Sequence, residues 1–125
     1  MAVYMLSVHD VEGQPHPGPE DMQQMFADVD AYNREVMAAG NWVFAAGLKP
    51  REAATVVSVT DGETTTTDGP FAESKEFLAG FWIVQCPSAE RAYEIAARAS
   101  SAPGPGGKPM NVPIEVRAVG SAPEV

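Results

Sequence analysis

Three runs of alternating residues constrain the fold of this chain more than any other feature. They cover residues 2–8, 77–86 and 111–119, and each has the length of a β-strand. Side chains on a strand point alternately to opposite faces, so each run has two faces. One face is wholly apolar, and we expect it to lie against helices: Tyr4, Leu6, Val8, Trp82, Val84, Cys86, Ile114, Val116 and Ala118. The opposite face is mixed: Val3, Met5, Ser7, His9, Phe81, Ile83, Gln85, Glu115 and Arg117.

Two helical segments separate these runs. The first begins at Pro19 and ends near Gly40, and its apolar residues follow the spacing of an amphipathic helix: Met22, Met25, Phe26, Val29, Tyr32, Val36 and Met37. The second follows Ser88, a suitable N-cap, and ends near Ser100. Its small-residue face, which suits close packing on a sheet, comprises Ala89, Ala92, Tyr93, Ala96 and Ala99.

Further strands are predicted in the middle of the chain, at residues 42–46 and 54–60. The dipeptide Asp61-Gly62 is a strong hairpin signal, so residues 63–67 should fold back antiparallel on the preceding strand. The element order predicts an α+β protein with a ferredoxin-like split β-α-β pattern, an antiparallel sheet and an added hairpin. With 125 residues we expect one domain over residues 1–120, followed by a fraying tail at 121–125.

The turn that follows the hairpin contains the main candidate site. Gly69 permits backbone angles that other residues avoid, and Pro70 has a fixed φ and no N–H group. An Asp before a turn usually accepts a hydrogen bond from the N–H two residues on, which here is Pro70. The Asp68 carboxylate therefore needs another partner. Two interpretations stay open: a rigid turn anchored by Phe71 within a solvated charge cluster, or a carboxylate positioned at the mouth of a pocket.

Composition excludes several classes of protein. The chain has 8 Lys and Arg against 17 Asp and Glu, a formal net charge of −9, so we expect no direct binding to nucleic acid or to an anionic membrane. A single cysteine, Cys86, excludes an internal disulfide, and we interpret it as a small buried hydrophobe. No leader and no apolar run of membrane-spanning length is present, which predicts a cytoplasmic protein. Neither a phosphate-binding glycine loop nor metal-ligand spacing occurs, so we predict no cofactor and no metal.

Several short segments resemble the YCII-related family in its DGPF-domain branch. They are Tyr4-Met5-Leu6, Gly47-Leu48, Asp68-Gly69-Pro70-Phe71-Ala72-Glu73-Ser74-Lys75-Glu76, Gly80-Phe81-Trp82 and Ile114-Glu115-Val116-Arg117. The resemblance implies a dimeric α/β barrel in the bacterial cytoplasm with no assigned activity. Members are often encoded beside, or fused to, extracytoplasmic-function sigma factors, which implies such a factor as a candidate partner. This branch has proline after the last arginine, whereas Ala118 follows Arg117 here.

The resemblance also directs attention to a His/Asp pair, because some YCII-related proteins have one at the barrel cavity. His9 and Asp68 are the candidate catalytic residues here, and their pairing is our inference. A histidine such as His9 is suited to acid or base catalysis, while Arg117 suits an anionic substrate group. The remaining candidate ligand-binding residues are Ser7, Phe71, Glu73, Lys75, Gln85 and Glu115. The alternatives are a solvated or structurally satisfied His9 and a salt bridge between Glu115 and Arg117.

Two functions therefore stay open. The first is a non-catalytic accessory module, a homodimer that binds a small ligand or a sigma-factor domain. The second is a small-molecule enzyme that uses the His/Asp pair. The mixed sheet face is apolar enough to need cover and too polar for a dry interface, so we expect a second copy to cover it and to leave a cavity. No residue pattern demands chemistry, which favours the first function.

Overall fold

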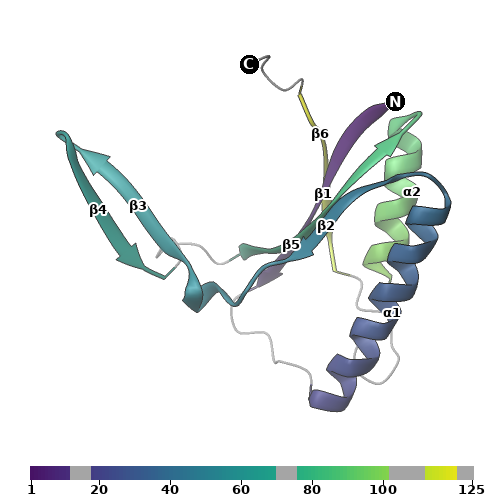
Figure 1. Cartoon of the computed structure of the whole chain (residues 1–125), viewed down its shortest axis with the longest axis horizontal. Helices are drawn as coiled ribbons and strands as arrows, with labels where there is room; N and C mark the ends of the chain where they lie inside the picture. The colour runs from purple at the N-terminus through teal and green to yellow at the C-terminus, as the bar shows by residue number, and fades with distance from the viewer. Residues whose placement is uncertain (12–17, 70–75, 102–111, 121–125) are drawn as a thin grey trace.

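The structure is a computed structural model that describes residues 1–11, 18–69, 76–101 and 112–120. Its elements, labelled in Figure 1, are β1 Ala2–Val11, α1 Pro19–Ala38, β2 Trp42–Gly47, the short 3-10 helix η1 Arg51–Ala53, β3 Thr55–Thr60, β4 Glu63–Asp68, β5 Glu76–Cys86, α2 Ala89–Ser100 and β6 Ile114–Ala118. The predicted elements are present, although β1 extends to Val11 rather than Val8. Of the predicted last strand, Val112, Pro113 and Val119 are not β-structure and Asn111 lies outside the described residues.

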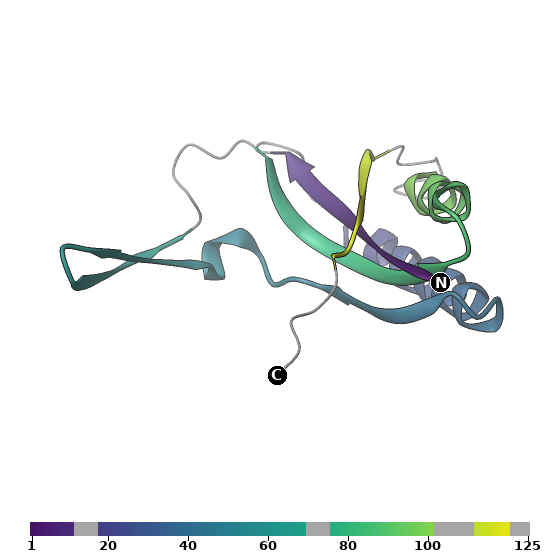
Figure 2. The ribbon, with the colours of Figure 1, turned by 90° about the horizontal axis from the view of Figure 1, so that it is seen from above.

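The main sheet has four antiparallel strands in the order β2-β5-β1-β6. This order, with α1 and α2 on one side of the sheet, is an α+β arrangement compatible with a ferredoxin-like fold (Figure 1). Strands β3 and β4 form a separate two-stranded sheet, which extends away from the body of the molecule in both ribbon views (Figure 2). At the tip of this hairpin Asp61 and Gly62 both have positive φ, as the predicted turn requires.

The core lies between the sheet and the two helices, as the alternation of the strands predicted. Leu6, Val84 and Cys86 are fully buried there together with Val36, Ala92, Ile95 and Ala96. Tyr4, Trp82, Ile114 and Val116 pack against this cluster, so the assignment of the apolar face to the helix side is confirmed. Ala118 shares that face because it pairs with Tyr4, but it is exposed near the end of β6. Burial raises the pKa of the Cys86 thiol, as expected for a buried hydrophobe.

The predicted core-facing residues of the two helices are partly wrong. In α1 only Val36 is buried, whereas Met22, Met37 and especially Phe26, 66% exposed, reach solvent. The N-terminal end of this helix extends beyond the sheet, so its apolar residues have no sheet beneath them (Figure 1). In α2 the helix is turned so that Ile95 enters the core and Tyr93 is 56% exposed.

Tyr32 connects the two helices to the sheet. Its hydroxyl donates a hydrogen bond to the Ile95 carbonyl at 2.6 Å, and its ring meets the Trp82 ring edge-on with centroids 5.7 Å apart. The Trp82 indole N–H in turn donates to Asn33 Oδ1 at 2.8 Å. Burial of the phenol raises the pKa of Tyr32 to about 12. These contacts fix the helical layer on one face of the sheet and leave the other face without helices.

Strands β2 and β5 approach closely at Gly80, which is buried and pairs with Gly47. A Cβ on Gly80 would lie 3.1 Å from the Ala46 carbonyl oxygen and 3.3 Å from the Gly47 Cα, both backbone atoms. Backbone atoms of a paired strand yield less easily than a flexible side chain, so this position requires glycine.

We expect Gly80→Ala to lower the free energy of unfolding by about 1–3 kcal/mol, because the added methyl group displaces β2. Urea denaturation followed by far-UV circular dichroism measures the effect. Gly47→Ala is the matched control, since a Cβ there meets no atom within 4 Å. Equal losses in the two variants would contradict a close approach specific to Gly80.

Candidate functional site

The face of the main sheet that turns away from the helices, which we call the open face, contains the predicted mixed set of residues. Met5 lies opposite both Ile83 and Arg117 in the strand register, and Ser7 lies opposite Phe81 and Glu115. Directly opposite residues of antiparallel strands share a face. The register therefore places the side chains of three strands together on the open face.

Strand β2 adds an aromatic side chain, Phe44, that the sequence analysis did not assign to either face. Trp42 pairs with Val84 and faces the core, but a β-bulge at Val43 lets Phe44 pair with Ile83 on the open face. Phe44 is 53% exposed, and its ring centroid lies 6.0 Å from that of Phe81. A bulge adds one residue to a strand and reverses its alternation, so sequence periodicity alone does not find Phe44.

On the open face the apolar residues lie on the inner strands and on β2, and the charged residues lie on edge strand β6. The apolar centre of the open face lies over β1, β5 and β2 and consists of four side chains: Met5, Phe44, Phe81 and Ile83. Edge strand β6 adds the exposed pair Glu115 and Arg117, and no ion pair joins them within the described part of the chain. The salt bridge considered as an alternative is therefore not formed, and both charges are available to a ligand or partner.

His9 lies at one end of the open face, near the end of β1. It is half-buried and pairs with Leu78, whereas the preceding Val8 pairs with Gly80. A register shift therefore lies between the two positions, with the extra residue, Ala79, on β5. Bulges often occur beside active sites, where they turn a side chain toward a site. His9 is thus placed on the predicted face at a local irregularity.

Asp68 lies on the hairpin rather than on the main sheet. It is the exposed last residue of β4 and pairs with Thr55. The adjacent Gly69 has a φ of +95° and donates its N–H to the Ala54 carbonyl at 2.6 Å, which closes the base of the hairpin. Between His9 and Asp68, both described, there is no hydrogen bond and no ion pair. Their meeting in one pocket stays a prediction.

Three predicted ligand-binding residues, Phe71, Glu73 and Lys75, lie outside the described residues. Gln85 is partly engaged in the fold, since its side-chain amide donates to the Gly40 carbonyl at 3.2 Å. Ser7 is buried in the register position predicted for it. The described candidates nearest to the apolar centre are therefore Ser7, Glu115 and Arg117.

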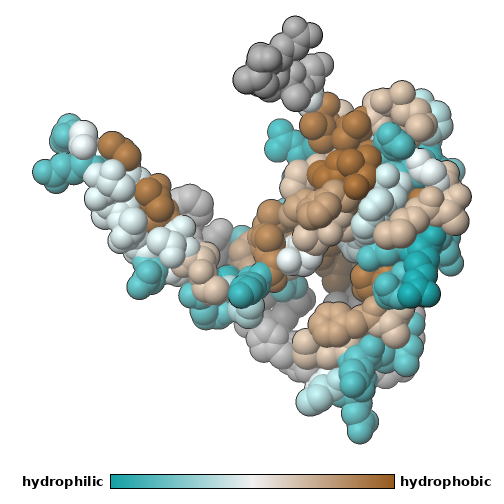
Figure 3. All heavy atoms as spheres, in the orientation of Figure 1, coloured by the Kyte–Doolittle hydropathy of each residue, from teal (hydrophilic) through white to brown (hydrophobic). Residues whose placement is uncertain are grey.

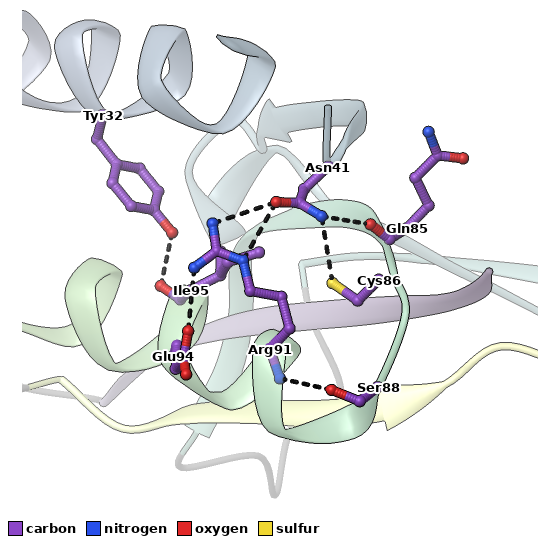
Figure 4. Close-up of polar contacts among 8 residues, drawn as sticks. All are labelled: Tyr32, Asn41, Gln85, Cys86, Ser88, Arg91, Glu94 and Ile95. Carbon is purple, nitrogen blue, oxygen red and sulfur yellow. Dashed lines mark hydrogen bonds and ion pairs between the residues drawn. The ribbon is translucent and has the colours of Figure 1, made fainter. Parts of the chain in front are cut away.

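A second polar group, centred on the buried Asn41, was missed in the sequence (Figure 4). Asn41 Nδ2 donates to the Gln85 carbonyl at 2.8 Å, and its Oδ1 accepts from Arg91 Nε at 3.3 Å and Nη2 at 3.2 Å. Arg91 Nη1 also contacts Glu94 Oε2 at 3.1 Å, and the Arg91 backbone N–H bonds the N-cap hydroxyl of Ser88 at 3.4 Å. Because the donors and acceptors satisfy one another, this cluster joins the end of α1 to β5 and α2 rather than forming a site.

Among the described residues no group of three or more His, Cys, Asp or Glu side chains is arranged to hold a metal ion. No helix in the described ranges has the length and apolarity needed to cross a membrane.

The fold and the open face together define an α+β protein with a four-stranded antiparallel sheet covered on one side. Comparison with known proteins is consistent with the sequence motifs. Residues 2–105 match the YCII-related domain. An uncharacterised protein of Rhizobium meliloti (strain 1021) is 37% identical over 83 residues, which is 66% of this chain and 67% of that protein. The chain belongs to the YCII-related family.

Proposed function

We propose that this chain acts as a homodimer in which the open faces of two sheets pack together and enclose a binding cavity for a small polar molecule. The observation that carries the proposal is the apolar centre of the open face, which no helix covers. Burying each such side chain is worth about 1.5–3 kcal/mol, so several per subunit outweigh the cost of association. Such an arrangement is the dimeric α/β barrel implied by the resemblance of the motif at residues 68–76 to the DGPF branch.

The polar residues of the open face determine what such a cavity would bind. Arg117 offers a guanidinium group that suits a carboxylate or phosphate, and Glu115 and Ser7 add hydrogen-bonding groups on the same face. A small molecule with one anionic group fits this set. We therefore favour a ligand-binding accessory protein. A sigma-factor domain stays a candidate partner on the family resemblance, and the net charge of −9 suits a basic partner surface.

Enzymatic activity is the second candidate, and the register shift beside His9 favours it. An imidazole on the rim of a cavity is suited to proton transfer. In this account His9 is the acid or base and Asp68 orients it.

Dimer formation is tested by Ile83→Asp, which places a charge at the centre of the proposed interface. We expect the variant to be a folded monomer, since a buried unpaired carboxylate is strongly unfavourable. Light scattering gives the mass and far-UV circular dichroism the fold. Ala27→Asp, an exposed position on α1, is the control and should leave the dimer intact. A dimeric Ile83→Asp variant would contradict the proposed packing of the open faces.

Ligand binding is tested by differential scanning fluorimetry against a set of small mono- and dicarboxylates and phosphate esters. We expect at least one compound to raise the melting temperature of the wild type, and Arg117→Gln to weaken that binding about tenfold or more, because the forked ionic contact is lost. Lys49→Gln, an exposed cation outside the main sheet, should bind as the wild type does. If Arg117→Gln binds every compound as tightly as the wild type, the proposed anion site is wrong.

A further inference from the structure

The β3–β4 hairpin is not covered by the other described helices and strands of the chain. Its two strands pair with each other, and among the described residues neither packs extensively on the main sheet or the helices. A lone two-stranded hairpin is marginally stable in water. Each strand of this hairpin is six residues long, and the hairpin extends away from the body, so contact with a further surface would stabilise it (Figure 1).

One face of the hairpin, which we call the arm face, is apolar in its centre. Val57 pairs with Thr66 and Val59 with Thr64, while Thr55 pairs with Asp68, so these residues share that face. Val57 is 62% exposed and Val59 is 65% exposed. Asp68 is the single charged residue among the six. The arm face is thus two exposed valines flanked by threonines, with one carboxylate at its base.

A hollow separates the hairpin from the body of the molecule. Figure 3 shows hydrophobic atoms along the hairpin on the side that faces the body, and more hydrophobic surface on the body across the hollow. The exposed apolar residues of the hairpin include Val57 and Val59, and those of the main sheet include Phe44. Both surfaces belong to the described part of one chain.

We propose that the hairpin is an arm that docks on a second copy of this chain, so that Asp68 of each subunit enters a site completed by the other. The proposal rests on the homodimer described above. A partner subunit that packs on the open face would also fill the hollow. Two-fold symmetry would then place the hairpin of each subunit against the other subunit.

The low charge of the contacting surfaces makes a second copy compatible as the occupant, although the whole chain is acidic. Two chains that each have a net charge of −9 repel one another, so they associate best through surfaces that are uncharged or complementary in sign. The arm face and the apolar centre of the open face contain no charge apart from Asp68. The open face adds Arg117, which is opposite in sign to Asp68 and forms no ion pair among the described residues.

Docking of the arm also accounts for the separation of the two candidate catalytic residues. Asp68 sits on the arm and His9 on the main sheet, with no bond between them in one chain. In the dimer the arm supplies the carboxylate from the neighbouring subunit. The site is then incomplete in a monomer, whether it binds a ligand or catalyses a reaction.

Val59→Asp tests the arm, because it adds a charge in the centre of the arm face. We expect it to weaken the dimer at least tenfold in sedimentation equilibrium, with unchanged far-UV circular dichroism. Ser58→Asp is the matched control, since it adds the same charge one residue away on the opposite face of the hairpin and should leave the dimer as in the wild type.

A second measurement keeps the test decisive if Val59→Asp misfolds. Photoreactive benzoylphenylalanine at position 59 or at position 68 should give a covalent dimer on irradiation, and at position 58 it should not. Two results would contradict docking of the arm in a stable wild-type dimer: no cross-link from position 59 or 68, or a Val59→Asp variant that behaves as Ser58→Asp does. Neither result would contradict the packing of the open faces. Cross-links at position 59 alone would exclude Asp68 from the shared site. A monomeric wild type would overturn the arm and the homodimer together.

Discussion

The structure depends on an imbalance between the two faces of one antiparallel sheet. On one face Leu6, Val84 and Cys86 are sealed by two helices, which Tyr32 and the Asn41–Arg91 cluster hold in place. The opposite face presents apolar side chains that no described helix or strand covers. Proteins seldom expose a large apolar patch to water, so the uncovered face is the physical reason to expect a partner. A second copy is the simplest source of that layer.

Alternation in the sequence predicted much of this arrangement because the strands on which it was based follow a period of two. Tyr4, Leu6 and Val84 lie where alternation places them. Alternation does not predict the face that Phe44 occupies. The bulge at Val43 reverses the alternation at that point, and no feature of the sequence indicates the bulge. Phe26 was assigned to the core by helical spacing, but helical spacing does not show where the sheet beneath the helix ends.

The candidate site was predicted less well than the fold, for a related reason. Chemical type identified His9, Arg117 and Asp68 as residues that can do chemistry, and strand register then placed His9 on the open face. Placing Asp68 requires the orientation of a hairpin that has no extensive contact with its own chain, and no local pattern encodes that orientation. The Asn41–Arg91 cluster was missed because its partners lie far apart in sequence and meet only through packing.

These features fit together in one account of a YCII-related protein. The open face would provide the floor of a cavity, Arg117 its binding charge and His9 an imidazole at its rim. The hairpin would close the cavity from the other subunit. Each part uses a surface that the single chain leaves uncovered, so binding, any catalysis and assembly would be properties of the dimer rather than of one chain.

The measurement that tests the central claim most directly is the mass of the wild-type protein in solution. Multi-angle light scattering across a range of micromolar concentrations distinguishes the two outcomes without any variant. The account predicts a constant mass of twice the chain's 13.2 kDa. A mass of 13.2 kDa throughout that range would contradict it, because the open face would then be exposed to water in the native protein.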